Sequence, residues 1–266
     1  MKILTVCVVI YNPDREELYK TFSGLQAATH NVARDISLRL LIVDNSDTVS
    51  IDTHFHPILA DTPTKIVQGQ GNVGFARANN YALAEGVGDF HLVLNPDVEM
   101  SALALQAAVE FMSTHPECGL LTPSASYPSG SKQYLCKQYP SVFDLFLRGF
   151  APRFIRTLFS TELARYEMRN KTNNTIYWDP PIVSGCFMFF RGNTFCAIGG
   201  FDERYMLYFE DFDISIRASQ TTRIAYVPTV QIVHSGGNAA RKGWWHIKQF
   251  GRSAALFFLS HGIKLF

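Results

Sequence analysis

Three carboxylates lie in an aromatic stretch of the sequence between residues 199 and 217. Glu210 and Asp211 directly follow Tyr205 to Phe209, and Asp213 comes two residues later. A carboxylate at an apolar rim either has a raised pKa and accepts a proton readily, or is held ionised by a cation or by hydrogen-bond donors. We therefore expect this acidic pair to include a general base.

The same acids also suit the start of a helix. Acidic side chains favour the positive end of a helix, and Asp213 is spaced to pair with Arg217 one turn later. This explanation accounts for Asp213. It accounts poorly for two adjacent acids after a row of aromatic residues, because a single polar cap would suffice. The catalytic interpretation of Glu210 and Asp211 therefore depends on the rest of the chain.

The composition is that of a single α/β domain. The 266 residues are 47% hydrophobic and 13% aromatic, and nothing marks an internal linker. A formal charge of +1 argues against a nucleic-acid partner. The five cysteines are scattered and are never spaced as paired metal ligands or redox pairs, so we expect a reducing, cytoplasmic compartment. No apolar run approaches the roughly 20 residues of a membrane-spanning helix.

Short β-branched runs alternate with helical patterns along the chain. The predicted strands cover residues 4–10, 38–43, 64–67 and 90–94, and predicted helices cover 15–29 and 75–85. This alternation predicts a mostly parallel, Rossmann-like sheet with helices on both faces. Ligands on such sheets bind beyond the carboxyl ends of the strands, where Asp44 and Asp97 both fall, although Asp also ends strands as a turn former.

A glycine loop supports a competing interpretation. Gly69, Gly71 and Gly74 form a GxGxxG pattern between a predicted strand and a predicted helix, as in dinucleotide-binding folds. The loop follows the third predicted strand, whereas such a loop usually belongs to the first crossover. A nicotinamide-dependent oxidoreductase therefore stays as an alternative. Otherwise the loop brings Asn72 and Arg77 to the ligand edge, where Arg77 could meet a phosphate or a pyrimidine.

Five landmarks stand in a fixed order along the chain. They are Val8 to Asn12, Val43 to Ser46, Gly71 to Asn79, Leu94 to Asp97, and Gly199 to Arg217 with His234 beyond it. This series resembles glycosyltransferase family 2, the inverting enzymes with a GT-A fold. Within the family it is similar to the rhamnosyltransferase-like members of bacterial surface polysaccharide biosynthesis, such as that of O-antigen. The resemblance covers nearly the whole chain.

The resemblance implies transfer of a sugar from a nucleotide diphosphate to a hydroxyl group. It makes Asp211 the general base, with Glu210 orienting it or binding acceptor hydroxyls, and it makes Asp44 the residue that recognises the nucleotide base, with Tyr11 and Arg77 as neighbours. The implied donor is dTDP-L-rhamnose or another dTDP- or UDP-linked sugar. The implied acceptor is a glycan or a saccharide on a polyprenyl diphosphate. A non-catalytic sugar-binding domain would keep this fold without the base.

The resemblance also implies a divalent metal, Mg²⁺ or Mn²⁺. The DXD-type motif of the family corresponds to residues 95–97, where Asn95 replaces the first acid, so Asp97 is the expected ligand and Glu99 a second candidate. His234 resembles the later histidine that joins the metal and diphosphate site. Arg241 is expected to meet the diphosphate, although a solvated basic loop explains it equally well.

The acceptor side is implied in the same way. Ser184-Gly185-Cys186 resembles the family segment that lines this side, where a glycine permits close approach of the backbone. Three aromatic residues, Trp178, Tyr205 and Tyr208, are candidates for stacking on sugar faces, and they suit a core equally well.

Two segments combine aromatic and basic residues. Residues 143–158 carry Arg148, Arg153 and Arg156 among phenylalanines and leucines, with Pro152 expected to split them into two short helices. Residues 244–266 add tryptophans, phenylalanines and lysines. Although such segments often pack as core, two of them suit the interface of an anionic bilayer. We therefore expect a catalytic domain over residues 1–240, and a basic, aromatic helical segment over 241–266 that faces a membrane or leads to a further domain. The protein would then be peripheral on the inner face of the cell membrane.

Overall fold

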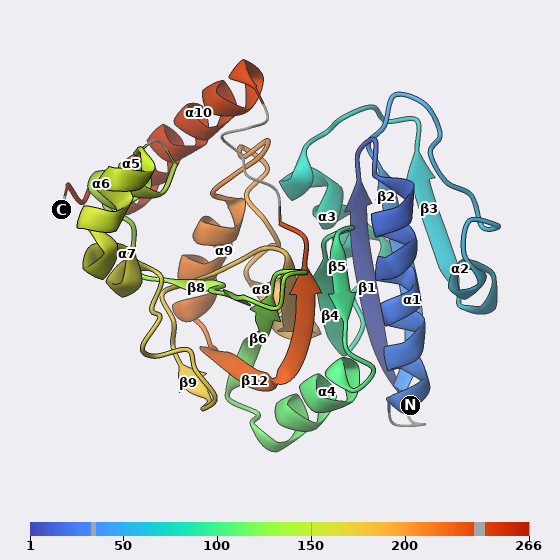
Figure 1. The fold of residues 1–266 in the computed structure, drawn as a ribbon. Coiled ribbons are helices and arrows are strands. Elements are labelled where there is room, and N and C mark those ends of the chain that lie inside the picture. Colours follow the sequence, from blue (N-terminus) through green and yellow to red (C-terminus); the bar gives the residue numbers. More distant parts are fainter. Residues whose placement is uncertain (33–35, 150, 237–242, 266) are drawn as a thin grey trace.

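The computed structural model describes residues 1–32, 36–149, 151–236 and 243–265 (Figure 1). Ten strands in these residues form one sheet: β1 (Lys2–Ile10), β2 (Ile36–Asp44), β3 (Thr64–Gln68), β4 (Phe90–Leu94), β5 (Val98–Met100), β6 (Cys118–Ser126), β7 (Lys132–Gln133), β9 (Tyr177–Trp178), β11 (Phe187–Arg191) and β12 (Arg223–His234). A separate pair consists of β8 (Cys136–Lys137) and β10 (Ile182–Val183). The helices are α1 (Arg15–Asn31), α2 (Pro57–Asp61), α3 (Phe75–Glu85), α4 (Ala104–Thr114), α5 (Val142–Gly149), α6 (Arg153–Leu158), α7 (Ser160–Tyr166), α8 (Gly192–Ala197), α9 (Glu210–Ser219) and α10 (Trp244–His261).

The main sheet has the strand order β3-β2-β1-β4-β11-β6-β12-β5. From β3 to β4 the strands are parallel, and β12 is parallel to β6. The expected mostly parallel sheet of an α/β domain is therefore confirmed. Between these two parts, β11 is antiparallel to both of its neighbours, with Phe187 opposite Leu94. This pairing brings the chain just before Phe187 to the edge where the parallel strands end.

Helices cover both faces of the sheet, as the continuous burial of its central strands requires. Val6 and Val8 of β1 belong to a core cluster with residues of α1 and α4. Cys7 and Val9, which point to the opposite face, pack with residues of α3. A third cluster joins β11 to α8, α9 and α10 on that side. The central strands are therefore mostly apolar, with Thr5, His91 and Thr122 as buried polar exceptions.

Several predicted elements match the structure closely. Residues 75–85 and 90–94 coincide with α3 and β4, and the helix predicted over 15–29 is α1, which ends at Asn31. Asp14 caps α1, because its carboxylate accepts hydrogen bonds from the backbone N–H of Glu16 and Glu17 at 2.9 and 3.1 Å. Pro152 separates α5 from α6, as expected.

The two basic, aromatic segments lie side by side. The end of the chain after α10 returns to the start of α5, where the backbone N–H of Val142 donates to the carbonyl of Lys264 at 2.9 Å (Figure 1). Part of each segment is core, since Leu147 and Phe257 are fully buried. Phe150 of the first segment lies outside the described residues, as do residues 241, 242 and 266 of the segment predicted over 241–266. In the described part of the chain, no helix is both long enough and apolar enough to cross a bilayer.

Candidate active site

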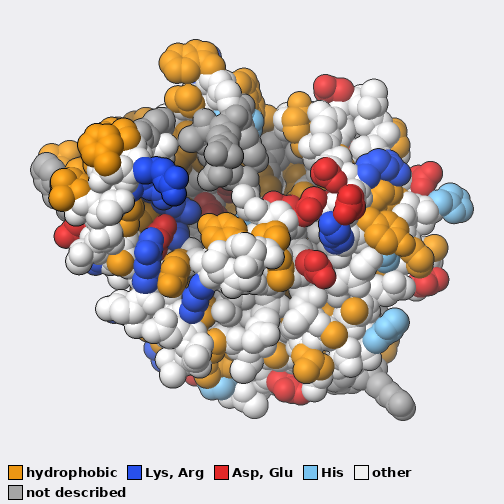
Figure 2. Space-filling model, in the orientation of Figure 1, with side chains coloured by type: hydrophobic (Ala, Val, Ile, Leu, Met, Phe, Trp, Pro, Cys, Tyr) orange, Lys and Arg blue, Asp and Glu red, His pale blue; other side chains and the backbone are white. Residues whose placement is uncertain are grey.

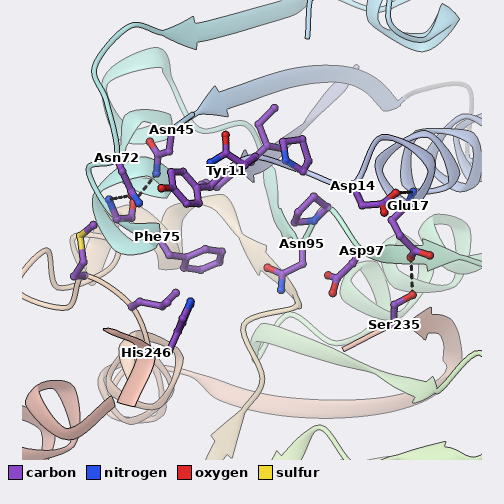
Figure 3. A pocket seen from close by; sticks show the side chains of 18 of the residues that line it. Tyr11, Asp14, Glu17, Asn45, Asn72, Phe75, Asn95, Asp97, Ser235 and His246 are labelled. Atoms are coloured by element: carbon purple, nitrogen blue, oxygen red, sulfur yellow. Dashed lines mark hydrogen bonds between the residues drawn. The ribbon is translucent and has the colours of Figure 1, made fainter. Parts of the chain in front are cut away.

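An open cavity of about 810 Å³ lies where the parallel strands end (Figure 3). It is lined by the residues after β1 and β4, the start of α1, residues 206–207 and 235–236, and the start of α10. The polar side chains that matter most for its chemistry are Tyr11, Asn45, Asn72, Asn95, Asp97 and His246. The cavity therefore occupies the position where α/β sheets bind ligands.

Asp97 and His234 come together through strand pairing. β12 is antiparallel to β5, and this register sets His234 opposite Val98, the residue after Asp97. The Nε2 of His234 lies 3.4 Å from Asp97 Oδ1, and its Nδ1 lies 3.0 Å from the Oε1 of Gln133. Burial lowers the pKa of His234, but the nearby Cys186 and Asp97 outweigh burial and raise it. Glu99, the second acid considered, is exposed on β5 and does not line the cavity.

The side chains at this point suit a hard divalent cation. Within the described residues no three His, Cys, Asp or Glu side chains are grouped to hold a metal. Asn95 supplies a further oxygen, because its Oδ1 is buried without a hydrogen-bond partner among the described residues. An amide oxygen, a carboxylate and an imidazole fit Mg²⁺ or Mn²⁺ when substrate phosphates complete the coordination.

Asp211 lies in the first turn of α9 and touches the backbone of Gly185. Its Oδ2 accepts a hydrogen bond from the Gly185 N–H at 3.0 Å, and its Oδ1 accepts one from the Phe212 N–H at 3.0 Å. A Cβ at position 185 would lie 3.1 Å from the Cβ of Asp211. Glycine at this position therefore permits the close approach that the sequence suggested.

Glu210 and Asp211 have unusual protonation. Burial, and then the neighbouring Asp211 carboxylate, raise the pKa of Glu210 to about 8. Burial also raises the pKa of Asp211, although the Gly185 and Phe212 N–H groups partly oppose it. The Oε2 of Glu210 is buried and has no hydrogen-bond partner among the described residues. At neutral pH Glu210 therefore holds a proton, which leaves Asp211 as the carboxylate that can accept one.

One short segment connects Asp211 to the Asp97–His234 pair. While Gly185 contacts Asp211, the carbonyl of the next residue, Cys186, accepts a hydrogen bond from the Asn95 N–H at 2.9 Å. The segment 184–186 therefore contacts the Asp211 carboxylate through Gly185 and the backbone of Asn95, a candidate metal ligand, through Cys186. A group transfer requires a base and a charge-stabilising site that are held in a fixed relation to each other, and this segment connects the two.

The turn before α9 is strained. Tyr208 and Phe209 both have left-handed backbone angles, with φ of 70° and 66°, which L side chains rarely adopt. Phe209 is held by the rings of Phe250 and Phe257, at centroid distances of 5.2 and 5.4 Å. The Tyr208 hydroxyl lies 2.9 Å from Nδ1 of His246, which lines the cavity. Packing of α10 therefore holds the strained turn that positions the side chains of Glu210 and Asp211.

The residues expected around the nucleotide are only partly brought together. Tyr11 lines the cavity and is half exposed. Asp44 is 1% exposed and faces its own loop: it accepts hydrogen bonds from the Ser46 N–H at 3.0 Å and from the Ser50 N–H and hydroxyl at 2.9 and 2.8 Å. Burial raises the pKa of Asp44, but these hydrogen bonds outweigh it and lower the pKa.

The two arginines expected near the phosphates are not part of the cavity lining. Arg77 is largely exposed and lies 3.7 Å from Glu203. Arg241 lies outside the described residues. Of the three aromatic candidates, Tyr205 is buried, and Trp178 of β9 packs against Phe111 of α4. Tyr208 does not line the cavity itself, but its hydroxyl lies 2.9 Å from Nδ1 of His246, which does.

The glycine loop has a structural role. It follows β3, the edge strand of the sheet, and Gly74 has a left-handed φ of 86°. A Cβ on Gly74 would lie only 2.6 Å from the carbonyl oxygen of Met206, which accepts a hydrogen bond from the Phe75 N–H at 3.0 Å. Gly74 therefore permits contact between the start of α3 and residues 206–207, and Gly74 and Asn72 also line the cavity.

Sequence reasoning missed several lining residues. Glu17 reaches across the cavity edge, where its Oε2 accepts a hydrogen bond from the Ser235 hydroxyl at 2.6 Å (Figure 3). Asp14 and Glu17 look in the sequence like an ordinary helix start. Trp245 and His246 join the lining because α10 folds back over the site, and no local pattern signals that return.

A model of the family described as glycosyl transferase family 2 matches residues 5–194. The chain belongs to this family. The expected resemblance is therefore confirmed, and the protein is a glycosyltransferase. Family 2 membership favours sugar transfer over the nicotinamide-dependent alternative.

Two curated relatives are rhamnosyltransferases. The chain is 27% identical over 249 residues to the N-acetylglucosaminyl-diphospho-decaprenol L-rhamnosyltransferase of Mycobacterium tuberculosis, covering 87% of this chain and 76% of the relative. It is 25% identical over 240 residues to the rhamnosyltransferase WbbL of Escherichia coli, covering 84% of each chain.

Solved glycosyltransferase structures share the GT-A fold. GalNAc-T7, bound to UDP, GalNAc and Mn²⁺, superposes with a TM-score of 0.65 at 14% identity, covering 98% of this chain. The mannosyltransferase PcManGT of Pyrobaculum calidifontis, bound to GDP-Man and Mn²⁺, has a TM-score of 0.57 at 19% identity, covering 96% of this chain. The chain spans 51% and 64% of these two structures.

Proposed function

We propose that this glycosyltransferase moves L-rhamnose from dTDP-L-rhamnose to a saccharide carried on a polyprenyl diphosphate, with inversion at the anomeric carbon. The observation that carries the proposal is the 184–186 segment, with Asp211 on one side and the Asp97–His234 pair on the other. The names of the two curated relatives support rhamnose as the transferred sugar, and the name of the mycobacterial relative supports an acceptor on a lipid diphosphate.

The donor nucleotide occupies the cavity in this proposal. Tyr11 offers a ring to the nucleotide base, and Asp44 acts on the base through the loop that it holds, where Asn45 reaches the cavity. Asp97, with His234 and Asn95, holds Mg²⁺ or Mn²⁺, which when bound supplies positive charge for the leaving diphosphate. Arg77 and Arg241 remain candidates for the diphosphate, and Arg77 would have to leave Glu203 to reach it.

The acceptor hydroxyl attacks from the Asp211 side. As its oxygen bonds to the anomeric carbon, its proton passes to the Asp211 carboxylate, and the bond from the anomeric carbon to the phosphate oxygen breaks with its electron pair leaving on the nucleoside diphosphate. Glu210 stays protonated beside Asp211, so it can orient Asp211 or donate to an acceptor hydroxyl without placing a second negative charge beside the Asp211 carboxylate. Attack opposite the leaving group gives the inverted product.

Ligand-induced thermal stabilisation tests the donor assignment. We expect dTDP with Mn²⁺ to raise the melting temperature of the protein more than UDP or GDP, and NAD to have no effect, because only what binds the native state stabilises it. Incubation with dTDP-L-rhamnose and an N-acetylglucosaminyl diphosphate lipid should then yield the rhamnosylated lipid. The proposal would be contradicted if NAD alone raised the melting temperature, or if none of the nucleotides did.

Membrane association is a separate part of the proposed function. Phe154 on α6 and Trp244 and Leu259 on α10 are 73%, 81% and 82% exposed, on the two segments that lie side by side. Basic residues accompany them, and Figure 2 shows hydrophobic and basic side chains over this end of the molecule. Such a surface suits the interface of an anionic bilayer, where a polyprenyl-linked acceptor resides.

Liposome sedimentation tests this association. We expect the protein to sediment with anionic liposomes at low salt, and the Arg153→Glu, Arg156→Glu double variant to lose most of this binding, since each basic residue contributes roughly 1 kcal/mol at such a surface. Leu103→Ser, which changes a residue 57% exposed before α4, is the control and should bind as wild type does. Equal sedimentation of the wild type and the double variant would exclude this surface.

A further inference from the structure

Three cations surround a single carboxylate near α9. Lys137 of β8, Arg148 of α5 and Arg169 after α7 lie around Glu167. The Nη2 of Arg169 is 2.7 Å from Glu167 Oε2, and the Nε of Arg148 is 3.8 Å from Glu167 Oε1. Lys137 is only 4% exposed, and its Nζ donates to the carbonyl of Tyr134. We call Lys137, Arg148 and Arg169 the basic cluster.

The basic cluster sets two arginines and a buried lysine around one carboxylate in direct contact, that of Glu167. Burial lowers the pKa of Lys137 to about 7, and the positive charge of Arg148 adds to the effect. The neighbouring Arg165 is different, because two carboxylates, those of Asp144 and Glu162, lie 3.6 and 3.0 Å from it. The charged form of a buried lysine beside two arginines is costly, and an anion that reaches the cluster would favour that charged form. Arg148 and Arg169 remain 46% and 44% exposed, so an anion has access.

The basic cluster lies on the Asp211 side of the site. Lys137 pairs with Ile182 in the β8–β10 sheet, three residues before Gly185, which contacts Asp211. Arg148 is close enough to Asp211 to favour its ionised form. In Figure 2, basic side chains gather over α5 and α7 beside a hollow in the surface. None of the three cations lines the cavity assigned to the donor.

We propose that the basic cluster binds the diphosphate of the acceptor. This inference rests on the proposed function, in which an acceptor hydroxyl meets Asp211. In an acceptor whose first sugar is joined to a lipid diphosphate, one sugar ring separates the diphosphate from the hydroxyl groups. A diphosphate held by Arg148, Arg169 and Lys137 therefore presents that sugar to Asp211, while the donor diphosphate stays on the other side of the 184–186 segment. Arginine forks suit bidentate binding of phosphate oxygens.

Acceptor preference tests the basic cluster. The wild type, Arg148→Ala and Arg169→Ala are compared on a short-chain N-acetylglucosaminyl diphosphate lipid and on a neutral alkyl N-acetylglucosaminide. We expect the ratio of kcat/KM for the two acceptors to fall at least about tenfold in each variant, because charge-assisted hydrogen bonds to the diphosphate are lost. Lys171→Ala, which removes a nearby cation that rests on the Tyr177 ring, should keep the wild-type ratio.

An unchanged ratio in both arginine variants, with an active wild type, would overturn the inference and leave the proposed function standing. If the wild type transfers rhamnose to neither acceptor, the proposed function fails, and binding then decides the inference. With dTDP saturating the donor cavity, calorimetry should show the diphosphate lipid binding to the wild type at least about tenfold more tightly than to Arg169→Ala. Equal affinity in both proteins would overturn the assignment.

Discussion

Replacing Asp211 with Asn is expected to lower kcat at least about a hundredfold while leaving donor binding unchanged. Asn has the same shape as Asp, and its amide oxygen can still accept the hydrogen bond from the Gly185 N–H, while the hydrogen bond from the Phe212 N–H is lost, so most of the local structure should survive. The amide cannot take the proton of the acceptor hydroxyl. Because the base acts only in the transition state, the loss should appear in kcat and not in the affinity for dTDP-L-rhamnose. Transfer assays and calorimetry measure the two quantities.

Asp213→Asn is the matched control in the same helical turn. The carboxylate of Asp213 lies 2.8 Å from the side chains of both Arg217 and His261, and the pairing with Arg217 is the one that the helix-start explanation predicts. The Asp213→Asn variant should therefore melt at a lower temperature but keep the wild-type kcat. The pH dependence gives a further check. Since the pKa of Asp211 is raised, wild-type activity should be lost as pH falls through a range above that of an ordinary Asp. Near-normal turnover of Asp211→Asn would refute the assignment.

Replacing Asp97 with Ala is expected to weaken Mn²⁺-dependent dTDP binding by about tenfold to a hundredfold. The carboxylate is the charged, hard ligand of the candidate site, and substrate phosphates depend on the cation it holds. His234→Ala should have a smaller effect in the same direction, because an imidazole is a weaker ligand than a carboxylate for a hard cation and must first lose the proton that its raised pKa favours. Calorimetric titration of dTDP in Mn²⁺ and in EDTA measures the difference.

Glu99→Ala is the control that tells the loss of a metal ligand at Asp97 from a general loss of negative charge. Glu99 lies two residues from Asp97, opposite Val233, and is exposed away from the cavity. Its replacement should leave dTDP binding as in the wild type. Unchanged nucleotide affinity and full activity in EDTA would mean that the site works without a metal.

The sequence by itself determined the elements and the edge where ligands bind. Apolar runs such as residues 90–94 predict buried strands because their periodicity and length are local properties, and Pro152 ends a helix wherever it occurs. The ends of parallel strands must meet at one edge, so Asp97 could be placed near a ligand before any contact was known. The ordered landmarks then identified family 2, which the family model confirms.

Only the tertiary structure decided which side chains meet. The contact of His234 with Asp97 follows from the β5–β12 register, and the contact of Gly185 with Asp211 follows from an antiparallel strand inserted between two parallel parts of the sheet. Neither register is written in a local pattern, because pairing depends on how distant apolar faces pack. For the same reason the sequence grouped Arg148 with a membrane surface, whereas its guanidinium group faces Glu167. Long-range packing of α5, α7 and β8 placed that charge beside Asp211.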